Sequence, residues 1–435
     1  MIFWKITPVK EGTIMQRTIA VIGGGASGMM SAIKAAESGA KVTIFEHNKL
    51  GKKILSTGNG KCNLTNRNMS TDCFFSHNMD RLQHCLHQFG VNETIHFFEN
   101  AGLYLKEKNG YFYPLSEQAS VVLQVLLNRV KTLSISVIYE DKVTDIKPVT
   151  KRKPGREVMV VTNNIPYFFD AVIICCGSQA APKTGSDGSG YKLAEKLGHK
   201  ILPILPSLVQ LRCDDKFCKE LAGIRTEAKI HIYDQKKKLW EESGELQLTD
   251  YGLSGIPIFQ LSGYVNRYLF QHKNSKLIAV IDFMPHMGNF DDLDFCQKRR
   301  RMLSNTTVEE FFCGILNQKL MKVFIQLAGL QHNTSITKVS NEKLLEVYGY
   351  CRHFTFHISG SNGFDNAQVC TGGVDLNEVT DSLESIYNPG VYFAGEILDV
   401  DGKCGGYNLQ WAWTSGCIAG EAAAGNNRSK TYVKS

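Results

Sequence analysis

The sequence predicts an α/β protein organised around a parallel sheet, and two segments far apart in the chain indicate this. Near the start, the apolar run Ile19 to Ile22 is followed by a glycine-rich turn, a helical pattern and a β-rich run at 42–45. This order is typical of parallel strands joined by a crossover helix. Near the end, a β-rich run at 390–393 again leads through glycines into a helical pattern. We therefore expect a discontinuous first domain.

The first glycine-rich turn has the spacing of a dinucleotide-binding motif. Residues 23–28 are Gly-Gly-Gly-Ala-Ser-Gly, which fits G-x-G-x-x-G after a strand and before a helix. Gly23 permits the tight turn, Gly25 lets the backbone approach a pyrophosphate, and Gly28 allows close helix packing. Glu46 ends the next strand, where a carboxylate can accept hydrogen bonds from ribose hydroxyl groups. The sequence therefore predicts a Rossmann-like domain that binds a dinucleotide.

The second glycine-rich segment favours FAD over NAD as that dinucleotide. The strand at 390–393 ends in Gly395-Glu396, and Gly405-Gly406 then opens a helix. The acidic end can bind a ribitol hydroxyl group. The helix N-terminus can face the flavin N1 and C2 oxygen, where negative charge develops on reduction. We infer FAD.

A separate domain for NAD(P)H is not visible in the sequence. Residues 185–190 are glycine-rich, but they follow no clean strand. We therefore expect a nicotinamide donor to visit the flavin face that the substrate also uses, which gives ping-pong kinetics.

Periodicity along the chain predicts its domain organisation. Residues 1–16 have neither strand period nor helix cap, so we interpret them as a mis-annotated extension, with Met15 as the true start. The Asn163-Asn164 pair predicts a hairpin between two β-rich runs. The predicted domains are a first FAD-binding part at 17–204, an inserted domain at 205–355 (β-rich at 205–287, helical at 288–350), a second FAD-binding part at 356–427 and a tail at 428–435.

Composition limits the class of protein and its compartment. The chain has 435 residues, 43% hydrophobic and 21% charged, which is ordinary for a globular protein. No apolar stretch reaches the length of a membrane helix. Thirteen cysteines without a C-x-x-C pair indicate free thiols and a cytoplasmic location. The Cys and His residues at 73–87 lack zinc-type spacing, so we expect no metal.

The net charge of +7 permits an anionic partner without requiring one. Basic runs occur at 151–153, 236–238 and 298–301, all away from the first glycine-rich motif. Solvated loops or helix ends are the favoured interpretation of these runs.

Four further motifs resemble one bacterial family. They are Gly58-Asn59-Gly60-Lys61-Cys62-Asn63-Leu64-Thr65-Asn66, Leu253-Ser254-Gly255, Thr371-Gly372-Gly373, and Gly395-Glu396-Ile397-Leu398-Asp399 continuing to Gly405-Gly406-Tyr407-Asn408. Together they resemble the BaiN/RdsA family of FAD-dependent oxidoreductases, from about Arg17 to Gly425. The family usually has Arg where this chain has Lys61. Lysine keeps the charge and loses the planar, bidentate fork.

The resemblance implies a glutathione-reductase-type FAD-binding domain, interrupted by a β-rich, barrel-like part and a helical part. It also implies three alternative activities. The first is reduction of 3-oxo bile-acid or steroid enones (delta-4/delta-6 reductase-like) with NAD(P)H. The second is synthesis of dihydrouridine in ribosomal RNA, and the third, weaker one is amine oxidation. In enone reduction, the β-carbon accepts hydride from flavin N5 and an acid protonates the α-carbon.

The motifs and the resemblance together predict the site residues. Those expected to bind the cofactor are Gly23, Gly25, Ala26, Ser27, Gly28, Glu46, Lys53, Gly58, Gly60, Lys61, Asn63, Thr65, Gly177, Gly395, Glu396, Asp399, Gly405, Gly406, Tyr407 and Asn408. Three residues are candidates for the proton donor. Cys62 lies beside Lys61, whose charge is expected to lower the pKa of the thiol. Tyr407 can donate from its hydroxyl group or cover the flavin ring, and His357 alternates with two phenylalanines in a strand pattern.

We favour a small-molecule enone as the substrate, because aromatic residues such as Tyr111, Phe112 and Tyr113 can line an apolar pocket. Ribosomal RNA is the alternative partner, supported by the net charge and by basic runs in the insert. The pattern leaves the oligomeric state open.

Overall fold

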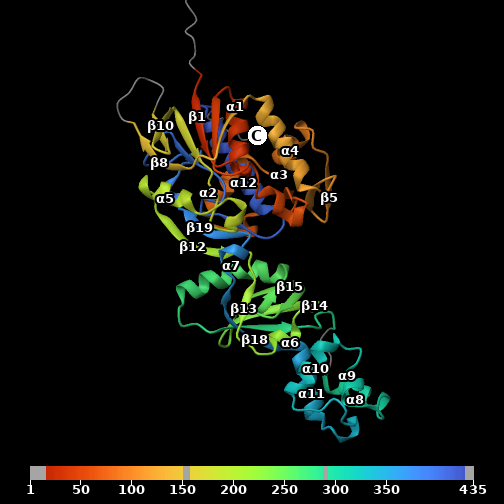
Figure 1. Cartoon of the computed structure of the whole chain (residues 1–435). Helices are drawn as coiled ribbons and strands as arrows, with labels where there is room; N and C mark the ends of the chain where they lie inside the picture. The colour runs from red at the N-terminus through yellow and green to blue at the C-terminus, as the bar shows by residue number, and fades with distance from the viewer. Residues whose placement is uncertain (1–15, 150–156, 288–291, 427–435) are drawn as a thin grey trace, which may run out of the picture.

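The computed structural model describes residues 16–149, 157–287 and 292–426. Figure 1 shows three tiers: an α/β part, a β-barrel below it and a group of helices at the far end. Three predicted segments lie outside the described residues. They are the extension at 1–16 except for its last residue, the basic run at 151–153 and the tail at 428–435.

A five-stranded parallel sheet forms the core of the α/β part. Its order is β20-β11-β1-β2-β7, with β1 (Thr18–Ile22), β2 (Lys41–Glu46), β7 (Ser136–Tyr139), β11 (Ala171–Ile174) and β20 (Val391–Phe393). All residues of β11 and β20 are buried, as expected for a parallel sheet covered on both faces. Because β20 comes from the end of the chain, the α/β part is discontinuous, which confirms that prediction.

Two long helices pack closely over this sheet (Figure 1). They are α1 (Ala26–Glu37), which follows β1, and α12 (Tyr407–Ala423), which ends the described chain. Glycines on α12 allow this: a Cβ on Gly416 would lie 2.6 Å from the Ser27 carbonyl oxygen, and one on Gly420 would lie 2.4 Å from that of Ser31. Side chains at these positions would push the helices apart.

Smaller elements surround the sheet. The predicted hairpin is present: β9 (Val158–Thr162) and β10 (Ile165–Phe169) pair antiparallel across Asn163 and Asn164, which have positive φ angles, and β8 (Val143–Pro148) completes this sheet. The remaining elements of the α/β part are β3 (Thr65–Asn66), β4 (Phe74–Phe75), β5 (Leu105–Lys108), β6 (Tyr111–Pro114), β21 (Asp401–Gly402), α2 (Met79–Gln88), α3 (Val91–Asn100), α4 (Ala119–Thr132) and α5 (Ser189–Lys196).

The insert contains a closed six-stranded barrel. Its order is β13-β16-β15-β14-β17-β18, with β13 (Leu211–Cys213), β14 (Arg225–Asp234), β15 (Lys237–Thr249), β16 (Gly252–Ser254), β17 (Leu277–Asp282) and β18 (Phe354–Ser361). Helices α6 (Cys218–Leu221) and α7 (Ile256–Gln271) belong to this part. Four helices follow β17: α8 (Asp292–Met302), α9 (Val308–Phe312), α10 (Gln318–Leu327) and α11 (Asn341–Arg352). The barrel-like and helical insert predicted from the sequence is therefore present.

Both predicted boundaries of the insert fall inside strands. The boundary at 204/205 lies in β12 (Ile201–Ser207), which pairs antiparallel with β19 (Val369–Val374) to connect the α/β part with the barrel. The boundary at 355/356 lies in β18, which is a barrel strand. Strands that run up to or across a junction keep their alternating pattern, so the sequence does not mark where one part ends.

Gly28 tests the packing of the glycine turn. A Cβ on Gly28 would lie 1.9 Å from the carbonyl oxygen of Gly23, so we expect Gly28→Ala to lower the free energy of unfolding by about 3 kcal/mol. Gly349→Ala is the matched control, because Gly349 is also helical and has open space around it. Thermal unfolding followed by circular dichroism should show a lower Tm for Gly28→Ala alone. Equal Tm values would contradict the packing role.

Candidate functional site

A cavity of about 980 Å³ lies at the carboxyl ends of β1, β2 and β11. Its wall includes Gly23 directly after β1, Glu46 at the end of β2 and Cys175 directly after β11. In open α/β sheets this edge is where ligands bind. The volume is at the upper end of the usual range for ligand pockets, about 300–1,000 Å³, as a long ligand requires.

The glycine turn gives the cavity an anion-binding end. Gly23 has φ +96°, and Gly25 precedes α1 without any side-chain cap, so the first N–H groups of α1 lack capping side chains. Ala26 and Ser27 of this first turn line the cavity. A Cβ on Gly25 would meet no atom within 4 Å. The space above Gly25 is therefore free for a ligand that approaches the backbone and the positive end of the helix.

Glu46 is held in place by two backbone N–H groups. Gly24 donates to its Oε2 at 2.8 Å, and Asn48 donates to its Oε1 at 2.7 Å. Each carboxylate oxygen keeps a further lone pair. Because Glu46 lines the cavity, it can accept hydrogen bonds from the hydroxyl groups of a ribose.

A second bare helix N-terminus opens onto the same cavity. Helix α12 begins after Gly406, which has φ +92° and provides no side-chain cap, and the first turn carries no acidic residue. Gly405, Gly406 and Asn408 line the cavity. The Oδ1 atom of Asn63, also in the wall, is buried and has no hydrogen-bond partner among the described residues. The helix N-terminus can face negative charge on the polar edge of a ring system, and Asn63 Oδ1 can accept a hydrogen bond from an N–H group on that edge.

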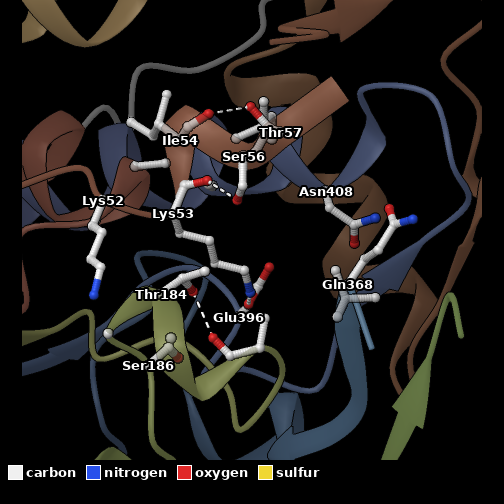
Figure 2. A pocket seen from close by; sticks show the side chains of 18 of the residues that line it. Lys52, Lys53, Ile54, Ser56, Thr57, Thr184, Ser186, Gln368, Glu396 and Asn408 are labelled. Carbon is white, nitrogen blue, oxygen red and sulfur yellow. Dashed lines mark hydrogen bonds and ion pairs between the residues drawn. The ribbon is translucent and has the colours of Figure 1, made fainter. Parts of the chain in front are cut away.

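A lysine–glutamate pair crosses the middle of the cavity (Figure 2). Lys53 Nζ lies 2.7 Å from Glu396 Oε2, and Ser178 donates to the same oxygen at 3.0 Å. Figure 2 shows Asn408 and Gln368 across the open space from this pair. The pair places one positive and one negative group where a polyhydroxylated linker could bind.

The structure brings thirteen of the twenty predicted cofactor residues into the cavity wall. These are Gly23, Gly25, Ala26, Ser27, Glu46, Lys53, Gly58, Asn63, Gly177, Glu396, Gly405, Gly406 and Asn408. The other seven, which are Gly28, Gly60, Lys61, Thr65, Gly395, Asp399 and Tyr407, lie outside the wall. Gly28 and Gly395 serve packing, since a Cβ on Gly395 would lie 2.3 Å from Ser27 Oγ. Thr65 is buried and donates to Gln410 at 2.6 Å.

Charged residues among these seven have protein partners instead. Lys61 is half-exposed and pairs with Glu117 at 2.9 Å. Asp399 is buried and accepts hydrogen bonds from the backbone N–H of His77 at 2.8 Å, with His77 Nδ1 2.9 Å away. The described residues contain no cluster of three or more His, Cys, Asp or Glu side chains arranged to hold a metal.

The expected low pKa of Cys62 is wrong. Its side chain is fully buried, and this burial raises the pKa of the thiol to about 11, although a hydrogen bond with Thr57 acts in the opposite direction. The Lys61 ammonium group points to Glu117 and does not act on Cys62. Cys62 also does not line the cavity. It is therefore a neutral thiol packed beneath the loop.

The other two candidates for the proton donor also lie away from the cavity wall. The Tyr407 hydroxyl group donates to the Asn68 carbonyl oxygen at 3.3 Å, and its ring packs edge-on against Phe74. His357 lies on β18 in the barrel, where its Nδ1 is 2.8 Å from Asp215 Oδ1. The structure does not bring Cys62, Tyr407 and His357 together.

Sequence reasoning missed residues that follow β11 and β7. Thr184, Gly185, Ser186, Asp187 and Ser189 line the cavity, as do Asp141 and Lys142. Lys142 pairs with Asp187 at 2.6 Å. Burial acts to raise the pKa of Asp187, but hydrogen bonds from Lys142 and Ser189 outweigh it and lower that pKa. The glycine-rich run at 185–190 was the feature of the sequence that could have indicated this part of the cavity wall.

The sheet, the glycine turn and Glu46 define a Rossmann-type dinucleotide-binding protein. The sequence matches the family described as HI0933-like protein Rossmann domain over residues 17–422. The chain belongs to this family, which confirms the resemblance to the BaiN/RdsA flavoproteins.

Three relatives have assigned activities. The chain is 39% identical to a 3-dehydro-bile acid delta(4,6)-reductase of Clostridium scindens, over 93% of this chain and 98% of that protein. It is 28% identical to a ribosomal RNA dihydrouridine synthase of Haemophilus influenzae and 26% identical to one of Escherichia coli, each over 91% of this chain and 95% of that protein. In the described ranges, no helix is long and apolar enough to span a membrane.

Alkylation tests the state of Cys62. With a pKa of about 11, only about 0.1% of the Cys62 thiol is ionised at pH 8, and burial also blocks access. We expect iodoacetamide to modify exposed Cys313 of the folded protein at pH 8 and to leave Cys62 unmodified. Peptide mass spectrometry measures both sites, and unfolded protein is the control in which both react. Equal rates at the two sites in folded protein would contradict this assignment.

Proposed function

We propose that this chain is a FAD-dependent oxidoreductase that uses NADH or NADPH to reduce a C=C bond conjugated to a carbonyl group. The proposed substrate class is a 3-oxo steroid or bile-acid enone. The observation that carries this proposal is the 39% identity, across nearly both full lengths, to the bile acid reductase of Clostridium scindens. The two ribosomal RNA relatives are more distant, at 28% and 26%.

The residues of the cavity fit FAD. The open space above Gly25 and the bare N-terminus of α1 suit a pyrophosphate, and Glu46 suits the adenosine ribose. Lys53 and Glu396 suit the ribitol chain. The N-terminus of α12 and the unpartnered Asn63 Oδ1 suit the polar edge of the ring system. Bound FAD would supply hydride transfer.

The wall near α12 suits an apolar substrate. Helix α7 contributes Ile256 and Phe259, and Leu208 follows β12. Ile256 is 62% exposed, so its aliphatic side chain is accessible to an apolar ligand in the cavity. Tyr111 and Tyr113 of β6 add aromatic surface to the same cavity. Together these side chains can bind a rigid hydrocarbon ring system.

Two arginines of the basic run at 298–301 are used within the protein, which disfavours this run as an RNA-binding surface. Arg299 donates to the carbonyl oxygens of Phe311 and Cys313 at 2.6 and 2.7 Å. Arg300 donates to those of Ile336 and Val339 at 3.0 and 2.8 Å. These guanidinium groups stabilise the helical part, and fewer donors remain for a phosphate backbone.

A Gly25→Val variant tests the FAD assignment. Gly25 has extended backbone angles and open space, so valine should not disturb folding, but its branched side chain would occupy the proposed pyrophosphate path. We expect the purified Gly25→Val protein to be colourless, which shows that flavin is absent. Its circular dichroism spectrum should match that of the wild-type protein, which shows that it is folded. Gly363→Val is the matched control, because Gly363 has nearly the same backbone angles and open space but does not line the cavity. A fully yellow Gly25→Val protein would contradict the assignment.

Anaerobic half-reactions test the substrate. We expect NADH or NADPH to bleach the flavin absorbance, and a 3-oxo-4-ene steroid to restore it. Unmodified ribosomal RNA should leave the protein reduced. Activity should change little between about 50 and 200 mM salt, because burial of an apolar substrate releases few counterions.

Three outcomes would oppose this expectation. Reoxidation by RNA together with a steep loss of activity in salt would show the alternative activity, dihydrouridine synthesis. Rapid reoxidation by oxygen after reduction with an amine, with hydrogen peroxide released, would show an amine oxidase. A flavin that neither nicotinamide reduces would exclude NAD(P)H as the donor.

A further inference from the structure

The β5–β6 hairpin places two tyrosines in the cavity wall that cofactor binding does not require. Tyr111 and Tyr113 both line the cavity, and they lie two residues apart on β6. Alternate residues of a strand share one face. Phe112, between them, is buried on the other face. The hairpin therefore directs two phenol groups toward the ligand space.

Tyr111 is fixed beside the turn that begins α12. A Cβ on Gly405 would lie 2.8 Å from Tyr111 Cε1, so the tyrosine ring packs directly on this glycine. Asn66, which lies opposite Tyr111 in the β3–β6 register, donates to the Gly405 carbonyl oxygen at 3.0 Å. The position of Tyr111 is thus tied to the helix N-terminus that faces the proposed ring system.

Neither tyrosine hydroxyl group has a hydrogen-bond partner within the described part of the chain. Other tyrosines do: the hydroxyl groups of Tyr268, Tyr387 and Tyr407 donate to Asp234, Glu378 and the Asn68 carbonyl oxygen. Tyr111 and Tyr113 are partly exposed, so their hydroxyl groups can donate to water until a ligand displaces it. Burial, together with nearby Tyr111, raises the pKa of Tyr113, so this group keeps its proton at neutral pH. Both hydroxyl groups are therefore available to donate to a ligand.

Resting on the enone reduction proposed above, we propose that the hydroxyl groups of Tyr111 and Tyr113 bind the carbonyl oxygen of the substrate and stabilise the negative charge that develops on it. When the β-carbon receives a hydride, the π-electron pair of the C=C bond moves toward the α-carbon and the carbonyl oxygen. The α-carbon then takes up a proton from solvent water and the carbonyl group re-forms. NAD(P)H supplies the two electrons, and both tyrosines keep their protons throughout.

This assignment makes the conjugated carbonyl group a requirement for reaction. Donors that face the developing charge bind the transition state more strongly than the ketone, so they raise the rate as well as the affinity. An otherwise similar alkene without the carbonyl group should bind to the apolar wall and remain unreduced.

Phenylalanine variants test the two hydroxyl groups. Tyr111→Phe and Tyr113→Phe each keep the ring and remove only the donor. We expect each to slow reoxidation of the reduced protein by a 3-oxo-4-ene steroid by about 100-fold, the effect typical of one lost oxyanion donor. The flavin content and circular dichroism spectra of both variants should match those of the wild-type protein, which shows that the variants fold and bind the cofactor. Tyr104→Phe, an exposed position just before β5, is the matched control.

A phenolic steroid gives a second readout. Equilenin resembles the reacting substrate when its phenol is ionised, so donors at the carbonyl position should lower the pKa of the bound phenol in the wild-type protein. Ultraviolet absorbance measures this shift, and we expect it to be lost in both variants and kept in Tyr104→Phe.

The results separate the two proposals. The enone could reoxidise the wild-type protein and both variants at the same rate, with the same pKa for bound equilenin. That result would overturn the tyrosine assignment and leave the proposed function standing. Failure of the enone to reoxidise the wild-type protein would overturn the proposed function and this inference with it.

Discussion

The loop that leads into α12 is tied to the inserted part by the largely buried guanidinium group of Arg267. Arg267 of α7 lies between the rings of Phe75 and Tyr264, with its Cζ 3.6 and 4.9 Å from their centroids. It donates to Thr371 at 2.9 Å and lies 3.5 Å from Asp401 Oδ1. Removing these charges from water is costly, and only such partners offset the cost. These partners come from β4, α7, β19 and β21. Arg267 therefore holds α7 of the inserted part against the loop that leads into α12.

The acidic residues of that loop consequently have different roles. Glu396 faces the cavity, whereas Asp399 and Asp401 are buried behind it, where they hold His77 and Arg267. Burial raises the pKa of Asp401 to about 6, and the nearby positive charge of Arg267 only partly opposes this increase. Asp399 and Asp401 therefore hold the loop on the side away from the cavity. Gly405 and Gly406 of the same loop line the cavity.

Local patterns explain why the fold and much of the cavity wall were predictable. The β1 strand, its glycine turn and Glu46 are encoded within thirty residues, so spacing alone predicts their geometry. The roles of Cys62 and Asp399 depend on burial by segments far away in sequence. A charged neighbour in the sequence does not predict this burial, because Lys61 pairs with Glu117 and does not lower the pKa of Cys62. The wall at 184–189 was missed for the same reason, because it becomes part of the site only when the sheet brings it beside Glu46.

The walls of the cavity come from two different parts of the fold, and this division bears on substrate choice. The strands and turns of the α/β part supply the polar groups around Gly25, Glu46 and Lys53, whereas α7 of the inserted part supplies Ile256 and Phe259. Relatives that span the same length are named for a bile acid and for ribosomal RNA. Substitutions at Ile256 and Phe259 can alter this part of the wall and leave Gly25, Glu46 and Lys53 unchanged, because the two sets belong to different parts of the fold. Arg267 and Gln260 of α7 bind the loop that leads into α12, so these contacts can hold that loop while the apolar residues of α7 vary.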